Sequence, residues 1–118
     1  MSVKKEKHLK NYEMIIALKP LLPDDLRKEI HKEIVELVKK DGGELLDVDV
    51  WGKRYLAYKI SGHNEGYYIV YDLKLSPSAV AEIKRQMQLK VEILRFMIVE
   101  MEDVSGIGKS IKKKELDI

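Results

Sequence analysis

The chain contains no cysteine among its 118 residues, which excludes a disulfide framework and any metal site built on thiolates. No apolar run approaches the ~20 residues that a bilayer-spanning helix needs. The charged start MSVKKEKHLK is followed by an apolar stretch, 14–18, that is too short for a signal peptide. These absences predict a soluble, intracellular protein, and the length predicts one domain that can bury its own core.

The sequence also lacks a P-loop, a GxGxxG fingerprint and an HExxH motif. His8, His31 and His63 are scattered along the chain, and none has a neighbour in a catalytic or metal-ligating pattern. We expect His31 to lie on the polar, surface side of its helix. Asp47 and Asp49 face the same way on a predicted strand, where one carboxylate could orient another, but a solvated strand face explains them equally well. We therefore predict no catalytic activity, no cofactor and no metal requirement.

Charge is distributed unevenly behind a net value of +2. Residues 1–10 carry +3 and residues 104–118 carry +2, whereas residues 11–103 hold fourteen cations and seventeen anions, a net charge of −3. This predicts a basic N-terminal extension at 1–10, a slightly acidic domain at 11–102 and a lysine-rich, mobile tail at 103–118. The tails could reach a polyanion or serve solubility alone. Nucleic-acid contact by the domain itself requires a local cationic patch.

The hydrophobic periodicity predicts six elements in the order β-α-β-β-α-β. Polar and apolar residues alternate in the first strand, and the first half of the third strand is apolar on both faces. Apolar residues recur every three or four positions in the helices. Gly42 and Gly43 end the first helix, and Ser76 and Pro77 begin the second. The predicted bounds are 12–19, 44–60, 67–75 and 91–101 for the strands, and 24–40 and a segment from 77 for the helices. This order predicts a ferredoxin-like α+β fold, a four-stranded antiparallel sheet with two helices on one face.

The second predicted strand contains the segment WGKRYLAYKI, which puts two cations among aromatic residues. Six apolar residues of this strand share one parity: Leu46, Val48, Val50, Leu56, Tyr58 and Ile60. Gly52 predicts a bend that swings Lys53 and Arg54 outward. Adjacent cations beside Trp51 and Tyr55 suit phosphate contact and guanidinium stacking. The alternative is that the cations merely protect an edge strand from aggregation. The tyrosines of GYYIVY, 66–71, favour core positions over an RNA-stacking platform.

Several segments together resemble one protein family. They are Tyr12-Glu13, Pro20, WGKR at 51–54 followed by LAY at 56–58, EGYY at 65–68, and Leu94-Arg95. Over about residues 11–102 the chain resembles the sixth protein of the bacterial small ribosomal subunit. The resemblance implies a ferredoxin-like fold and a structural role in the cytoplasmic ribosome. It also implies binding to the central domain of small-subunit ribosomal RNA, together with the small, basic eighteenth small-subunit protein.

The resemblance and the local chemistry give two sets of candidate residues. The predicted RNA-binding residues are Lys53, Arg54, Trp51 and Arg95. The predicted partner-binding residues are Glu44, Asp47, Asp49 and Tyr55, because acidic groups would steer a basic partner. The sequence leaves open whether the two cations at 53 and 54 serve RNA or the protein interface.

Two departures from the family pattern bear on the candidate site. Tyr55 stands where the family commonly has a second arginine, and Lys59 stands where it often has proline. A pair of adjacent arginines is therefore not available here. The alternative function is a regulatory module of the same fold that binds a small ligand or a protein.

Overall fold

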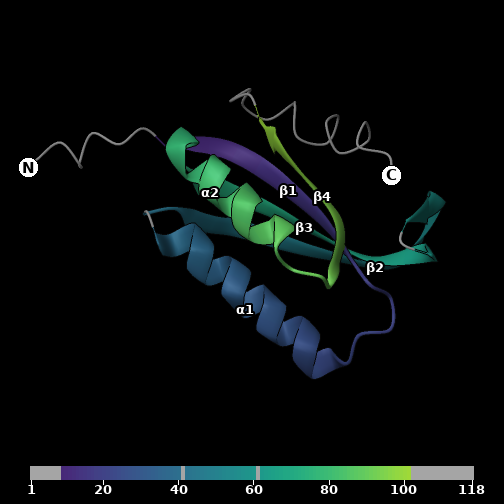
Figure 1. Ribbon diagram of the computed structural model, residues 1–118. Helices are drawn as coiled ribbons and strands as arrows, with labels where there is room; N and C mark the ends of the chain where they lie inside the picture. The colour runs from purple at the N-terminus through teal and green to yellow at the C-terminus, as the bar shows by residue number, and fades with distance from the viewer. Residues whose placement is uncertain (1–8, 41, 61, 102–118) are drawn as a thin grey trace, which may run out of the picture.

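The computed structural model describes residues 9–40, 42–60 and 62–101. The elements are β1 (Lys10–Leu18), α1 (Asp24–Lys40), β2 (Glu44–Ile60), β3 (His63–Leu75), α2 (Pro77–Gln88) and β4 (Ile93–Glu100). The strands form one antiparallel sheet in the order β2-β3-β1-β4, and both helices cover the same face (Figure 1). The predicted ferredoxin-like fold is confirmed.

The predicted tails lie outside the described residues, apart from Leu9 and Lys10. The proposed division of the chain at 10 and 103 therefore stays a prediction. Neither helix in the described part of the chain is long and apolar enough to cross a membrane.

The first helix occupies the residues that the sequence predicts. Asp24 and Asp25 lie in its first turn and Lys39 and Lys40 in its last, so each charge complements the helix dipole. Ile30, Ile34 and Val38 are buried at steps of four and form the stripe that packs on the sheet. Gly42 follows the helix with a φ of 83°, a left-handed conformation that glycine adopts without strain.

The main core lies between the helices and the sheet. Alternate residues of β1 and β3 meet the buried stripes of α1 and α2 there. The buried members are Tyr12, Met14, Ile16, Leu18, Ile30, Ile34, Val38, Ile69, Tyr71, Leu73, Leu75, Ile83 and Met87. Leu26, Leu37 and Val80, which the sequence assigns to the same stripes, are partly buried against this core. The two interior strands, β1 and β3, thus pack against both helices.

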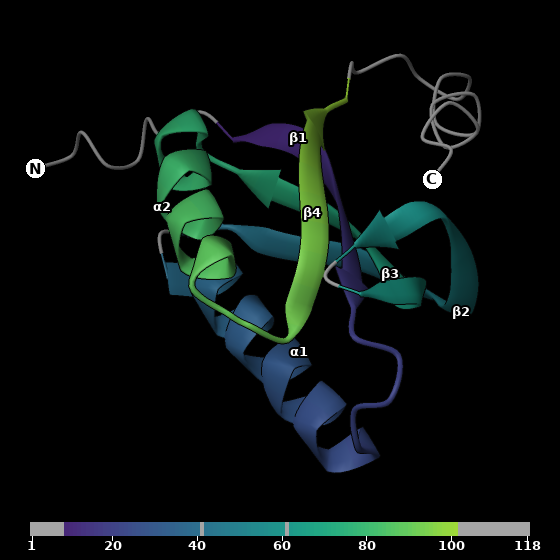
Figure 2. The same cartoon turned by 45° about the vertical axis from the view of Figure 1, so that its right-hand side comes forward.

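A second, smaller core lies on the helix-free face of the sheet. Ile15, Ala17, Leu56, Tyr68 and Val70 are buried together there, and Trp51, Ile60 and Leu94 pack against them. The far part of the β2–β3 hairpin curves away from the plane of the sheet (Figure 2). A Cβ added at Gly66 would lie 3.3 Å from the Cβ of Ala17. The hairpin therefore packs closely on β1, and this packing explains why β1 is buried on both faces.

The six apolar residues of β2 that share one parity do not lie on one face of the sheet. Its pairing with β3 shifts between Leu45 and Asp47, between Val50 and Gly52, and again beyond Tyr55. Each extra residue moves the following side chains to the other face of a strand. The six residues are consequently divided: Val48 packs on the main core, Leu56 and Ile60 pack on the second core, and Leu46, Val50 and Tyr58 are exposed.

His31 does not occupy the surface position expected from the sequence. It is half-buried and stacks on Tyr71, with 5.6 Å between ring centroids. The His31 Nδ1 and the Tyr71 hydroxyl share a hydrogen bond of 2.8 Å. Tyr71 is fully buried, and its hydroxyl needs a partner at the helix–sheet boundary. The histidine supplies that partner, which gives it a structural role.

The unsubstituted protein is expected to lose stability at alkaline pH, and the Tyr71→Phe variant is expected not to show this loss. Burial raises the pKa of the Tyr71 hydroxyl well above its ordinary value. Above about pH 10 the unfolded tyrosine ionises while the folded one keeps its proton, so unfolding becomes easier as pH rises. Losing the His31 bond should cost about 1 kcal/mol near neutrality. Denaturant unfolding at several pH values measures both effects, and an equal alkaline loss in the variant would contradict the assignment.

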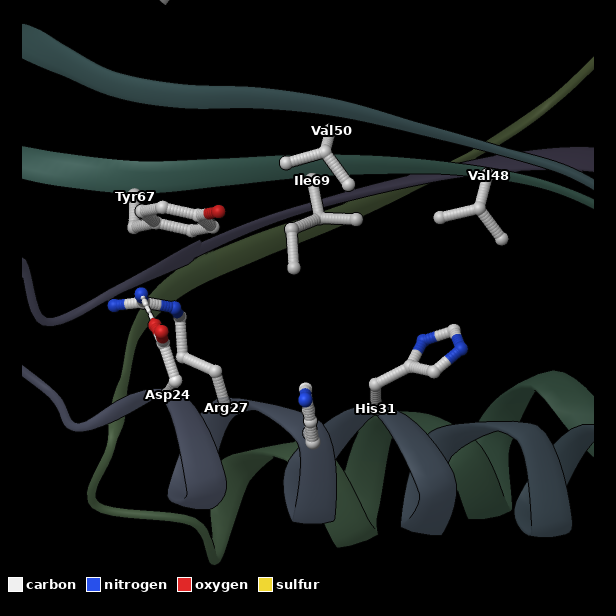
Figure 3. A pocket seen from close by; sticks show the side chains of 8 residues that line it. Asp24, Arg27, His31, Val48, Val50, Tyr67 and Ile69 are labelled. Atoms are coloured by element: carbon white, nitrogen blue, oxygen red, sulfur yellow. Dashed lines mark hydrogen bonds and ion pairs between the residues drawn. The ribbon is translucent and has the colours of Figure 1, made fainter.

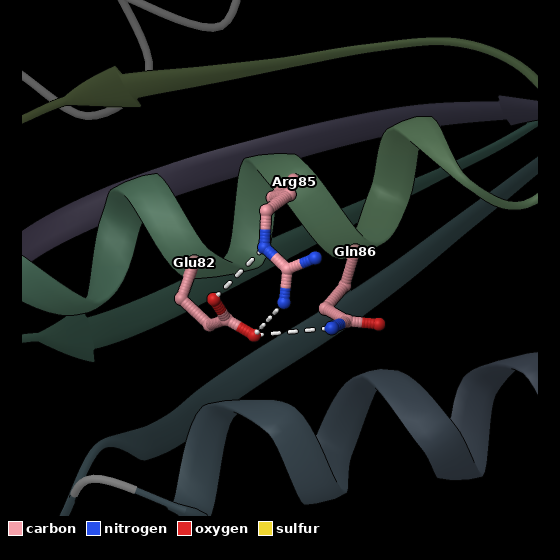
Figure 4. Close-up of polar contacts among 3 residues, drawn as sticks. All are labelled: Glu82, Arg85 and Gln86. Atoms are coloured by element: carbon pink, nitrogen blue, oxygen red, sulfur yellow. Dashed lines mark hydrogen bonds and ion pairs between the residues drawn. The ribbon is translucent and has the colours of Figure 1, made fainter.

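Polar contacts organise the exposed side of α2. Arg85 donates to both Glu82 carboxylate oxygens at 3.2 and 3.0 Å, and Gln86 donates to one of them at 3.0 Å (Figure 4). The hydrogen bond from Arg85, followed by that from Gln86, lowers the pKa of Glu82. Lys90, beyond the end of α2, forms an ion pair with Glu33 of α1. Ser76 occupies the N-cap position as predicted, but its hydroxyl makes no capping bond.

Candidate nucleic-acid interface

The two predicted RNA-binding cations lie directly after a bend in β2. Gly52 has a φ of 80°, and a register shift accompanies it. Lys53 and Arg54 beyond it are both exposed. Arg54 Nη1 donates to the Lys53 carbonyl oxygen at 3.0 Å, which draws the guanidinium back along the strand. In the described part of the chain neither cation forms an ion pair, so both charges are available to an external anion.

Trp51 is directed toward the protein. It is half-buried, and its ring stacks on Tyr68 with 6.3 Å between centroids and 30° between planes. Its indole Nε1 donates to Asp49 Oδ2 at 3.1 Å. The ring and the carboxylate thus hold the strand just before Gly52. Trp51 therefore has ring and hydrogen-bond partners within the protein, and its assignment to RNA binding stays a prediction.

The hairpin beyond the cations exposes two further aromatic rings. Tyr55 is 78% exposed and Tyr58 is 66% exposed. Lys59 beside them is also exposed. The sequence predicts Tyr55 as a partner-binding residue and Tyr58 as a member of the apolar face of the strand. The bend at Gly52 was the available signal that the strand leaves the sheet and frees such a ring. Aromatic faces beside cations suit single-stranded RNA as well as protein.

Arg95 lies on another strand but on the same face of the sheet as the hairpin. It is half-buried in β4 and stands opposite Ala17 of β1. Ala17 belongs to the small core beneath the hairpin, and Leu94 packs against that core. The structure therefore brings Arg95 to the side of the sheet that the hairpin covers.

The predicted partner-binding acids lie at the other end of β2. Glu44, Asp47 and Asp49 stand opposite Lys74, Asp72 and Val70 of β3, all on the helix-free face. The extra residue at Leu46 brings Glu44 onto the same face as the two aspartates.

Two further carboxylates join these acids on the helix-free face. Asp72, on β3, is half-buried and stands opposite Asp47 on one side and Glu13 of β1 on the other. Glu13 is fully buried. In the sequence, Glu13 occupies a position of β1 that faces away from the main core, and this position could have indicated that it lies beside the other carboxylates. The described residues contain no group of acidic or histidine side chains arranged to hold a metal ion.

The comparisons with known proteins agree with one another. The sequence model described as ribosomal protein S6 matches residues 11–100. Small ribosomal subunit protein bS6 of Mycobacterium tuberculosis is 38% identical over 91 residues, which cover 77% of this chain and 95% of that protein. The protein of the same name from Mycobacterium leprae is 40% identical with the same coverage.

One solved structure supports the architecture. The crystal structure of 30S ribosomal protein S6 from Thermotoga maritima aligns with a TM-score of 0.75 at 22% identity. The alignment covers 92% of this chain and 95% of that one. At this identity the likeness shows the fold, and the sequence matches carry the family assignment.

Proposed function

The chain belongs to the ribosomal protein S6 family, whose members are structural proteins of the small ribosomal subunit in the cytoplasm. We propose that it binds the central domain of small-subunit ribosomal RNA together with the basic eighteenth small-subunit protein. The observation that carries this proposal is the separation of charge along β2. Exposed cations follow the bend at Gly52, whereas carboxylates occupy the straight part of the strand.

The separation supports two different contacts. Lys53 and Arg54 offer two exposed charges to phosphates, and Arg95 is a further cation, on the helix-free side of the sheet. A patch of this size gives weak RNA binding that depends on salt. The acidic part of β2 would repel phosphates but attract a basic protein. RNA affinity is therefore expected to increase when the partner adds its own cations.

The double variant Lys53→Ala with Arg54→Ala is expected to weaken RNA binding by the complete heterodimer. The slope of log affinity against log salt should become shallower by about two phosphate contacts. A filter-binding titration of central-domain RNA at several salt concentrations measures this slope. The double variant Lys32→Ala with Lys84→Ala is a matched control, because it removes two exposed helical cations away from the bend.

The same titration separates the roles of the two cations. A lone protein that binds as tightly as the heterodimer would contradict cooperative assembly. If the Lys53 and Arg54 substitutions weaken pairing and leave the salt slope unchanged, these cations belong to the protein interface. Co-sedimentation of the full chain with small subunits at high salt tests incorporation directly, and failure to co-sediment would contradict a ribosomal role.

A further inference from the structure

The strand β4 forms the second edge of the sheet. It is the last strand in the order β2-β3-β1-β4, and in the part of the chain that the structure describes it pairs with β1 alone (Figure 2). Its residues from Ile93 to Val99 are all half-buried, so each side chain is partly covered and partly open. An edge strand also presents unpaired backbone N–H and C=O groups, which can pair with a strand from another chain. β4 is therefore a candidate surface for strand pairing.

β4 has few of the features that usually prevent such pairing. Natural edge strands are protected by lysine, proline, a bulge or short length. The segment ILRFMIVE contains neither lysine nor proline, and Arg95 is its single cation. Its acid, Glu100, is engaged in an ion pair, with 3.5 Å between its Oε2 and the Lys10 Nζ. The register shift against β1 lies at the start of the strand, beside Leu18, and the pairing is regular from Arg95 onward. Most of this edge is thus apolar and regular.

Both faces of this edge are apolar. Phe96 and Ile98 pack against the main core on the helical face. Met97 and Val99 alternate with them and lie on the helix-free face. A charged side chain on either face of an added strand would lose part of its hydration, which costs free energy unless the charge finds a partner. The matching strand must therefore be apolar on both faces.

The opposite edge of the sheet, β2, does not offer such a strand. On its helical face a groove with a volume of about 260 Å³ separates it from α1, and Val50 and Arg27 line this groove from opposite sides (Figure 3). Its other face carries the carboxylates of Glu44, Asp47 and Asp49. Pairing β2 of one copy with β4 of another would bring these carboxylates beside apolar side chains and take them out of water. Such head-to-tail pairing would also repeat into an open filament.

The residues that follow β4 in the chain also fit this edge poorly. Gly106 and Gly108 interrupt the segment 104–111, and glycine is depleted in strands. The lysines at 112–114 are contiguous, so one of them would have to enter an apolar face. A strand that is apolar on both faces is, however, supplied by β4 itself.

We propose that β4 pairs in antiparallel fashion with β4 of a second copy of this chain. The pairing joins two four-stranded sheets into one continuous sheet with all helices on the same face. The copies are related by a two-fold axis perpendicular to the sheet, and two-fold symmetry is the commonest among homo-oligomers. Opposite residues of antiparallel strands project to the same face. Odd-numbered residues of β4 therefore pair with odd-numbered ones, which leaves few possible registers.

Side-chain chemistry selects the register in which Met97 lies opposite Met97 of the second copy. Phe96 of each copy then lies opposite Ile98 of the other, and an aromatic residue opposite a β-branched one stabilises neighbouring strands. Arg95 lies opposite Val99, near the end of the paired segment, where its guanidinium can reach water. The register uses the part of β4 whose pairing with β1 is regular.

Neighbouring registers fit less well. Centring the pair on Arg95 would bring two like charges together, which destabilises paired strands. Centring it on Phe96 would draw in residues 93–94, where the pairing of β4 with β1 is irregular. Centring it on Ile98 would set the carboxylate of Glu100 opposite the Phe96 ring. The Met97 register is therefore the one to test.

Because the chain has no cysteine, single-cysteine variants of the full-length protein test the pairing by disulfide cross-linking. In Met97→Cys the two thiols lie opposite each other, with Cα atoms about 4.5–5.5 Å apart, which is within reach of a disulfide. Mild oxidation should convert this variant to a covalent dimer. In Arg95→Cys the two thiols lie about 13 Å apart along the strands, so cross-linking should be at least about tenfold slower. Leu46→Cys, on the exposed edge of β2, is a second control and should also cross-link slowly.

Sedimentation equilibrium of the protein without cysteine measures the same association. The unsubstituted chain should show a monomer–dimer equilibrium, and hydrogen exchange of β4 amides should slow as protein concentration rises. Met97→Lys should raise the dissociation constant by about tenfold or more, because two lysines would face each other at the axis. Leu46→Lys makes the same change in charge on the other edge and should have little effect. Denaturant unfolding checks that each variant folds, and Met97→Cys, which adds no charge, remains a test if Met97→Lys does not fold.

Three results would overturn the proposal. The first is a chain that stays monomeric and cross-links equally slowly at all three cysteine positions. The second is faster cross-linking of Leu46→Cys than of Met97→Cys, which would place the contact on β2. The third is growth beyond the dimer, which would indicate head-to-tail pairing. The proposal does not rest on the proposed function, so none of these results bears on binding to RNA or to the basic partner.

Discussion

Ile34→Ala should lower the free energy of unfolding by about 2–5 kcal/mol. Ile34 is fully buried at the centre of the α1 stripe, between the flanking residues Ile30 and Val38. Replacing it removes apolar contacts and leaves a cavity that a rigid helix on a four-stranded sheet cannot collapse to fill. Chemical denaturation monitored by Trp51 fluorescence measures the change.

Lys32→Ala is the matched control for this variant. Lys32 is exposed on the same helix, and alanine favours helix at least as well as lysine. Its effect should stay within about 0.5 kcal/mol. A loss of less than about 0.5 kcal/mol for Ile34→Ala would show that the stripe does not pack on the sheet as described.

The second large effect is expected at Gly43, between α1 and β2. A Cβ at this position would lie 2.4 Å from the Val38 carbonyl oxygen and 2.9 Å from the Lys74 carbonyl oxygen. Both neighbours are backbone atoms, so the helix end or the β2–β3 pairing must move. Gly43→Ala should therefore destabilise the protein by about 3 kcal/mol, the upper part of the range for overpacking.

Gly42→Ala is the informative comparison. Gly42 has a φ of 83°, but a Cβ there would meet no atom within 4 Å. Its cost is backbone strain alone, about 1–2 kcal/mol. Denaturant midpoints of the two variants, compared at unchanged m-value, separate steric overlap from strain. Equal destabilisation would contradict the close approach at Gly43.

The helices and the order of helices and strands along the chain could be predicted because their signals are local. Asp24 and Lys40 mark the ends of α1 through charge, and the glycines that follow stop it. The bend at Gly52 is a local signal as well. The register shifts in β2 could not be predicted, because they depend on which β3 residue each β2 residue faces. The added residue at Trp51 was enough to put Leu56 on the opposite face of the sheet from Val48.

The candidate site divides in the same way. Exposure of Lys53 and Arg54 follows from a glycine in their own strand. The groove between β2 and α1 could not be predicted in this way, since the side chains of Val50 and Arg27 line it from separate elements. The surface position predicted for His31 was wrong because its partner, the Tyr71 hydroxyl, comes from a strand much later in the sequence. Sequence periodicity describes the faces of one element, whereas these features depend on two elements meeting.

The central position of β1 has a consequence for synthesis of the chain. Tyr12 stands between Leu73 of β3 and Glu100 of β4, so β1 gains its first neighbour only after more than half the chain is made. At translation rates of about 5–20 residues per second this wait is on the order of seconds. Throughout it, the apolar segment 12–18 lacks both cores that later bury it. The yield of folded protein should therefore depend on the rate of synthesis as well as on final stability.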